Sequence, residues 1–260
     1  KGKYQKYNIF ERVDKLYNSE LFYASGEIYI YKSFLNKLDF GAGIREEYFN
    51  GDVFSKNTGS SSVSASKTDR LLASAYTYFT FDDMEHFYFP DRGTRLNIEF
   101  SVNTDFSDDY PLSPTLLFEM NKVVPVRYNL AFLFDLYSRS LFSTDYPLIK
   151  TTLVGGEPYF RYFNYHLPFV GLPPVTVADR FVNIAFLGFR LQVNKNQYIS
   201  LLYNVMAQGN DLAHFDNFNT IGGGGIKYSV NTAIGPIDLG IGYSEYHETP
   251  TFSANFGYWF

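Results

Sequence analysis

The chain has 260 residues, a net charge of −5 and no cysteine, so disulfide and zinc-thiolate chemistry are excluded and nothing indicates nucleic-acid binding. Aromatic residues make up 20% of it, which suits a surface band that faces lipid and its headgroups. No apolar run approaches the roughly 18 residues that a membrane-spanning helix needs, so any membrane crossing is expected to use strands.

Segments that alternate apolar with polar residues recur along the whole chain. The clearest runs from Leu96 to Asn103 and puts Glu99 on the polar face. A glutamate would be costly in the core of a soluble sandwich, whereas a polar lumen accepts it. The pattern predicts an all-β fold, a transmembrane antiparallel β-barrel of about twelve strands. The number is ten if the two segments with the least regular alternation are not strands. The predicted strands are 4–14, 20–32, 36–49, 70–82, 93–104, 114–123, 125–139, 181–194, 197–208, 219–231, 234–247 and 250–260.

The connections between these strands alternate between short and long. Tight turns are predicted at 33–36, 122–125, 194–197 and 233–236, whereas 50–69, 105–113, 140–180 and 209–218 are long or polar. Short turns on one side and long loops on the other are typical of outer-membrane barrels. The Ser-rich stretch 55–66 is predicted to be an external loop.

The longest connection, about 140–180, contains Gly155 and Gly156, which permit a sharp chain reversal with positive φ. It is rich in aromatic residues between Phe142 and Phe169, a composition that argues against disorder. This loop is therefore expected to pack, either over the mouth of the barrel or folded into the lumen.

The last segment alternates as well, and Phe256, Tyr258 and Phe260 share one face. It resembles the final strand of outer-membrane barrels of Gram-negative bacteria, in which terminal aromatic residues serve as the insertion signal. The soluble alternative is a sandwich that ends in a strand.

The residues that usually carry chemistry are sparse. The histidines, at positions 86, 166, 214 and 247, lack neighbours at metal-ligand spacing, and the chain has no Gly-x-Ser-x-Gly elbow. The glycines 222–225 open a strand rather than a phosphate loop. We expect no catalytic residues, no metal and no cofactor. The alternative is a barrel phospholipase, for which His247 and Ser244 are the nearest pair.

Several segments in order resemble the C-terminal barrel of the Omp85, or bacterial surface antigen, superfamily. Phe89–Leu96 resembles its P-x-x-G start of a strand, and Gly155-Gly156 followed by Arg161 resembles its long sixth loop. Gly235–Leu239 resembles the start of its penultimate strand. Within the superfamily, 169–172, 196–199 and 221–225 look like the barrel that follows a patatin-like phospholipase domain.

This resemblance implies a single domain, 1–260, that forms the C-terminal part of a longer protein. It implies a bacterial outer-membrane location and a role in anchoring, and helping to export, an upstream lipid hydrolase. The implied partners are outer-membrane lipids, the barrel assembly machinery during insertion and, as an option, further copies of the chain. A passive pore is a further alternative.

The resemblance also implies that the sixth loop enters the lumen and that Arg161 meets an inward-facing group. Asn204 stands where the family usually has an aspartate. The candidate partners are therefore Glu99, Asp135, Asp238 and Tyr198.

Overall fold

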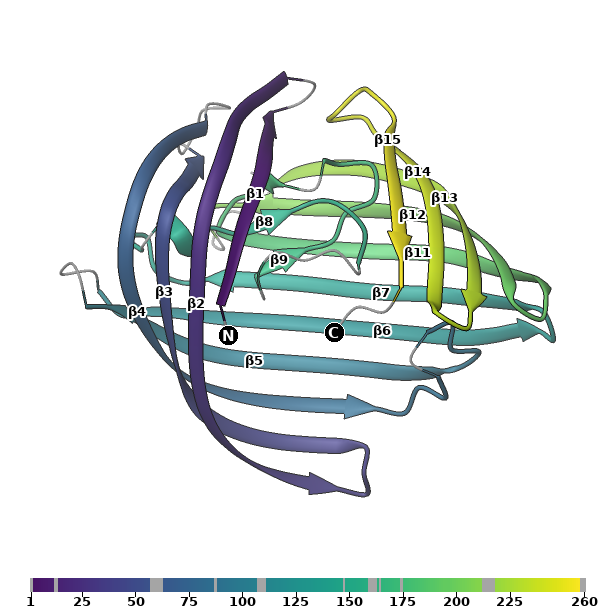
Figure 1. The fold of residues 1–260 in the computed structure, drawn as a ribbon. Coiled ribbons are helices and arrows are strands. Elements are labelled where there is room, and N and C mark those ends of the chain that lie inside the picture. The colour runs from purple at the N-terminus through teal and green to yellow at the C-terminus, as the bar shows by residue number, and fades with distance from the viewer. Residues whose placement is uncertain are drawn as a thin grey trace.

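The structure is a computed structural model that describes residues 2–11, 14–56, 63–86, 88–106, 111–146, 148–158, 163, 165–173, 175–211 and 218–257. Twelve strands form one sheet in which each strand pairs antiparallel with the next along the sheet. In chain order they are β1 (Gly2–Glu11), β2 (Asp14–Phe34), β3 (Leu38–Lys56), β4 (Val63–Asp82), β5 (Gly93–Asp105), β6 (Ser113–Arg127), β7 (Leu130–Leu141), β11 (Phe181–Asn194), β12 (Gln197–Gly209), β13 (Asn219–Thr232), β14 (Gly235–Ser244) and β15 (Thr251–Phe256). The sheet curls into a barrel wall (Figure 1), which confirms the predicted fold class.

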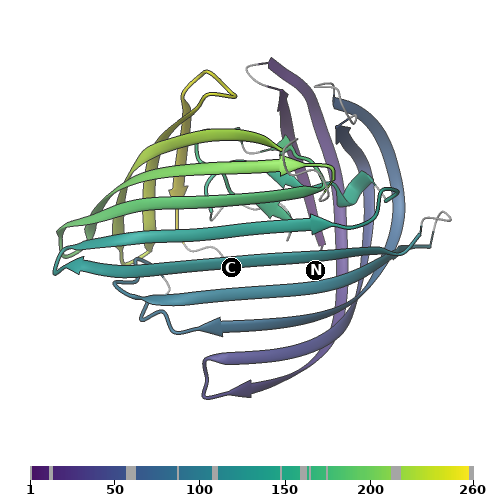
Figure 2. The ribbon, with the colours of Figure 1, turned by 180° about the vertical axis from the view of Figure 1, so that it is seen from behind.

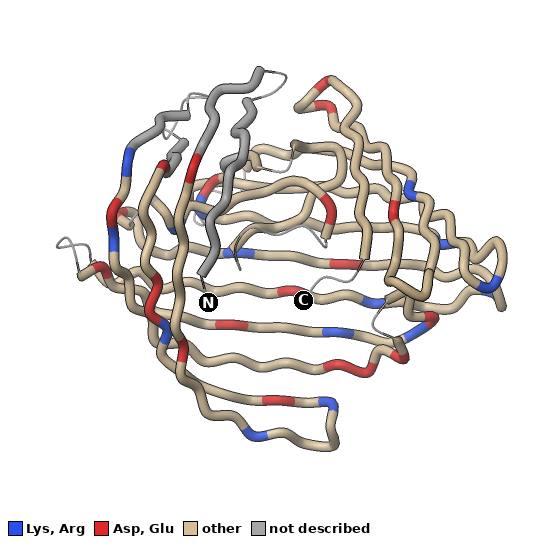
Figure 3. The backbone as a smooth tube through the Cα atoms, in the orientation of Figure 1, with Lys and Arg blue, Asp and Glu red and all other residues tan. Residues whose placement is uncertain are grey.

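Period-two alternation sets the two faces of this wall. Ile226, Leu239 and Ile241 are exposed on the outside, whereas Ser229 and Asp238 are buried on the inside. Acidic and basic residues occur along the strands as well as near the turns (Figure 3). Two residues near strand centres, Arg45 and Glu99, lie on the lumen face and pair with each other. A polar interior and an apolar exterior are what a strand-built membrane wall requires.

Some strand boundaries differ from the prediction. The ladder of β3 and β4 continues to the pair Lys56↔Val63, so most of the predicted loop 50–69 is strand, and only 57–62 lies outside the described residues. β2 begins at Asp14 rather than at residue 20. The Ser-rich stretch 55–66 is predicted to be an external loop, but its described residues 55–56 and 63–66 belong to the β3–β4 ladder.

The predicted turn at 122–125 is wrong. β6 continues through Pro125 to Arg127, and the turn lies at 128–129. The register shifts between Pro125 and Arg127. This irregularity lets a proline, which has no N–H to donate to the ladder, remain within the strand.

The wall opens between its first and last strands, β1 and β15, which stand on either side of a gap in Figure 1. Among the described residues no ladder joins these two strands. β1 pairs with β2 only as far as Ala24, so the described part of β2 from Ser25 to Phe34 pairs with β3 alone.

The long connection between β7 and β11 lies inside the wall (Figures 1 and 2), so the expectation that it folds into the lumen is confirmed. It contains the 3-10 helix η1 (Leu148–Lys150) and the short strands β8 (Leu153–Val154), β9 (His166–Leu167) and β10 (Thr176–Val177), which form a sheet in the order β10-β8-β9. No helix among the described residues is long and apolar enough to cross a membrane. The described residues 148–158, 163, 165–173 and 175 of this connection are called the plug below.

Replacing the outward-facing Ile241 by arginine tests the wall assignment. An arginine near the middle of the bilayer is expected to cost about 2–4 kcal/mol of unfolding free energy. The same change at Ile234, in the β13–β14 turn and 80% exposed, should cost at most about 1 kcal/mol. Urea unfolding in lipid vesicles measures both, and equal losses would contradict the assignment.

Candidate functional site in the barrel lumen

The plug is held by an apolar cluster against the inner faces of β11, β12 and β13. Phe169, Leu167 and Leu172 are buried in the plug, and Ile184 and Met206 are buried on the wall. The remaining buried members of the cluster are Tyr137, Val154, Val170, Ala178, Val182, Phe186 and Ile221. Burial of large apolar side chains is the main stabilising term in such contacts, so the plug is a packed element of the fold.

Glycines on the inner wall allow the plug to approach closely. A Cβ on Gly242 would lie 2.8 Å from the backbone nitrogen of Gly171, and one on Gly223 would lie 2.8 Å from Phe169. Gly171 itself has φ +96° and lies against the backbone of Tyr243. Because glycine has no side chain, backbone meets backbone here.

Asn204 on β12 holds the same part of the plug by hydrogen bonds. Its Oδ1 accepts from the backbone nitrogen of Val170 at 3.2 Å, and its Nδ2 donates to the carbonyl of Val170 at 3.3 Å. Asn204 is fully buried. An asparagine can both donate and accept, so it satisfies both backbone groups of one residue, which a carboxylate could not do.

Two buried ion pairs connect the plug to opposite parts of the wall. Lys150 pairs with Glu47 of β3, and the Tyr23 hydroxyl donates to the same carboxylate at 3.1 Å. On the other side, Lys227 of β13 lies 3.2 Å from Glu157, which also accepts from Ser253 of β15 at 3.3 Å. Removing one partner of a buried pair leaves an uncompensated charge, so these contacts fix the position of the plug.

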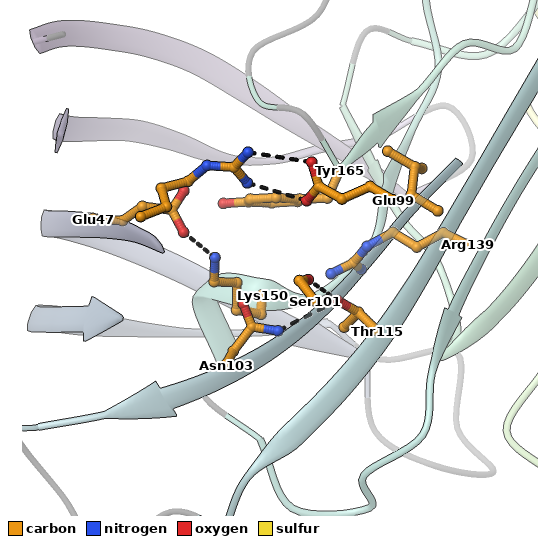
Figure 4. Close-up of a pocket in the computed structure, with 10 residues that line it drawn as sticks. Glu47, Glu99, Ser101, Asn103, Thr115, Arg139, Lys150 and Tyr165 are labelled. Atoms are coloured by element: carbon orange, nitrogen blue, oxygen red, sulfur yellow. Dashed lines mark hydrogen bonds and ion pairs between the residues drawn. The ribbon is translucent and has the colours of Figure 1, made fainter. Parts of the chain in front are cut away.

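A polar cavity of about 30 Å³ lies where η1 meets the wall (Figure 4). Arg139 of β7 projects into it, donates to the Thr152 hydroxyl at 2.6 Å and lies 5.1 Å from the ring centre of Tyr165. Across the cavity Arg45 binds Glu99 through two hydrogen bonds of 3.2 Å. A space of this size accommodates about one water molecule, so the cluster is suited to holding the plug rather than to binding a substrate.

The predicted loop residues lie as follows. Gly155 and Gly156 have φ of +130° and +70°, and Gly156 accepts from the nitrogen of Phe169 at 3.0 Å, so the chain reverses there. Arg161 lies outside the described residues.

The proposed partners of Arg161 all lie on the inner wall. Glu99 binds Arg45, and Asp238 accepts from Ser229 at 2.5 Å and from Asn255 at 3.0 Å. Asp135 lies opposite Asn121 in the ladder. The ring of Tyr198 stacks on the ring of Phe89. Among the predicted insertion-signal residues, Phe256 is exposed on the outer face, whereas Tyr258 and Phe260 lie outside the described residues.

His166 and His247 fit structural roles. His166 is fully buried in the plug, and its Nε2 lies 3.0 Å from the Gly155 carbonyl. His247 donates its backbone N–H to the Ser244 hydroxyl at 3.2 Å. Among the described residues no three His, Cys, Asp or Glu side chains gather as a metal site would require.

The sequence reasoning missed Glu47, Lys150, Glu157 and Lys227. For Glu47 and Lys227 a signal was present, because each is a charged residue at a lumen position of an alternating strand. The two plug residues carried no such signal, since a connection without regular structure has no periodicity to interpret.

Comparisons with known proteins agree with this fold. The model of the OMP85 superfamily matches residues 5–260. A solved structure with a similar fold is BamA from Haemophilus ducreyi lacking POTRA domains 1–3, at a TM-score of 0.63 and 12% identity. The match covers 97% of this chain and 57% of that one. No curated protein matches. The chain belongs to the OMP85 superfamily and is a bacterial outer-membrane β-barrel.

Lys150→Met tests the ion pair with Glu47. The change should lower the unfolding free energy by about 3 kcal/mol, because the buried carboxylate loses its cation. Adding Glu47→Gln should recover much of that loss. Arg92→Met is the control, since its 69% exposed side chain pairs at the surface and should cost less than about 1 kcal/mol. Denaturant unfolding measures all three variants, and a loss for Lys150→Met no larger than for the control would contradict the assignment.

Gly242→Ala tests the glycine contact. The added methyl meets the backbone of Gly171, so we expect a loss of about 1–3 kcal/mol and faster trypsin cleavage at Lys150 as the plug shifts. Gly222→Ala is the matched control, because its nearest contact would be 3.4 Å away. Cleavage at the wild-type rate in the Gly242 variant would show that the plug does not depend on this contact.

Proposed function

We propose that this barrel anchors an upstream patatin-like lipid hydrolase domain in the outer membrane and helps to export it. Membership of the OMP85 superfamily and the order of the motifs that resemble the patatin-linked branch support this role. The observation that carries it is the plug: a barrel whose lumen is filled by its own packed connection suits a membrane domain that serves another part of its protein.

A passive pore is the weaker alternative. The plug buries large apolar residues against β11, β12 and β13 and forms buried ion pairs with β3 and β13. An open water-filled lumen would have no reason to bury these groups, since water-filled porin interiors are lined by polar side chains.

A barrel phospholipase is likewise less well supported than the anchoring role. It would need a serine and a histidine together on the lipid-facing wall. Ser244 is fully buried on the lumen side of β14, and its hydroxyl accepts the backbone N–H of His247. The arrangement is a turn contact rather than a nucleophile and its base, for which a ring nitrogen would have to face the hydroxyl.

The same role implies particular partners. The exposed outer face, which includes Phe252 and Phe256 near the end of the chain, suits outer-membrane lipid. Insertion would involve the barrel assembly machinery, and association between copies of the chain is a further option consistent with anchoring.

The full-length protein tests the proposal. Its upstream sequence should contain a Gly-x-Ser-x-Gly elbow, and the full-length protein should hydrolyse phospholipid, whereas purified residues 1–260 should not. Without the barrel the upstream domain should leave the outer-membrane fraction. Turnover by residues 1–260 that vanishes on His247→Ala would instead support the barrel enzyme, and an unrelated upstream domain would refute the anchoring role.

A further inference from the structure

The connection between β4 and β5 is longer than the other hairpin connections at the same end of the barrel. The turns 35–37, 128–129, 195–196 and 233–234 span two or three residues, and they define the short-turn end. The connection between β4 and β5 leaves the same end, because Leu38 pairs with Phe81, but it spans residues 83–92. Its described residues 83–86 and 88–92 are called the lid.

The lid contacts a distant part of the wall. The ring of Phe89 stacks on Tyr198 of β12, with centres 4.5 Å apart and planes 15° apart. Arg190 of β11 donates to the Pro90 carbonyl, and its guanidinium lies 5.7 Å from the Tyr198 ring centre and 6.0 Å from that of Phe89. In the sheet order, β6, β7 and β11 separate the base of the lid from Tyr198. Since Arg190 and Tyr198 are buried on the lumen face, the lid meets them from the inside.

The lid has a defined shape. The backbone nitrogen of Asp83 donates to the Thr94 carbonyl at 3.0 Å, and the Thr94 nitrogen donates to the Asp83 carboxylate at 2.5 Å. Phe89 has φ +52°, which is uncommon for a residue with a side chain, so its contacts with the wall must offset a conformational cost.

A cavity of about 140 Å³ adjoins the stack and is lined by Asp91, Arg127 and Gln192, among others. Phe89 and the Pro90 carbonyl contact the wall beside this cavity.

We propose that the lid is a second closure of the lumen, at the short-turn end, in series with the plug. Two closures in series mean that loss of one leaves the lumen blocked by the other. The inference concerns this barrel alone and does not depend on the upstream domain, so its test and that of the proposed function can fail separately.

A single reporter cysteine tests the lid, because the native chain has none. Asp135 lies between Tyr137, which packs with the plug, and Ala131, which lines the cavity beside the lid. In detergent micelles, Asp135→Cys should react slowly with a water-soluble maleimide. With Phe89→Ala and Arg190→Ala added, the rate should rise at least tenfold.

Two further variants make the test decisive. Arg92→Ala changes a surface ion pair of the lid with Glu85 and should leave the rate unchanged. Phe89→Ala alone should give an intermediate rate and serves if the double change prevents folding. A reporter that reacts as fast with the intact lid as without it would overturn the proposal.

Ion conductance in planar bilayers separates the two closures. Replacing 151–172 by a short Gly-Ser linker, or releasing the lid by Phe89→Ala with Arg190→Ala, should each leave conductance low. Both changes together should raise it at least tenfold. Full conductance on removal of the plug alone would show that the lid does not close the lumen.

Discussion

Lipid offers no hydrogen-bond partners, so every backbone N–H and C=O that crosses it must be satisfied within the protein. In this chain antiparallel ladders between neighbouring strands, in the order from β1 to β15, satisfy the backbone of the wall between its two edges. Ladders of extended strands send alternate side chains to opposite faces, so a charged residue at an inward position of a strand lies in the lumen. Arg45, Glu47, Glu99 and Lys227 are there for this reason, and they then determine what can be held inside.

The polar lumen has consequences for the plug. A long connection that entered an apolar interior would have to bury its own backbone without partners. Here Asn204 binds both backbone groups of Val170, and Gly156 bonds to Phe169 and Leu172 within the plug. Glycines on β13 and β14 make room for this backbone. The side-chain amide of Asn204 thus holds the main chain of the plug.

Much of the fold could be predicted from the sequence, because alternation is a local property that a lipid-facing wall enforces strictly. The faces of Leu96, Glu99 and Ile241 followed from it directly. The prediction failed where local composition and tertiary context disagree, as at Pro125, which a strand irregularity accommodates. The candidate site was harder to predict. Entry of the loop into the lumen was expected, but the pairing of Lys150 with Glu47 depends on a fold that brings together two residues separated by 103 positions in the sequence.

The ion pairs at the two sides of the plug also bear on how the barrel assembles. Lys150 binds β3, which precedes the plug in the chain, and Glu157 binds β13, which follows it. Neither strand alone offers the plug its complete set of partners, so docking is complete only when both halves of the wall are in place. Contacts between residues so far apart in sequence form late and slow the folding of a chain. The order of events is therefore constrained: if the strands closed before the connection entered, the barrel would have to reopen before the plug could dock.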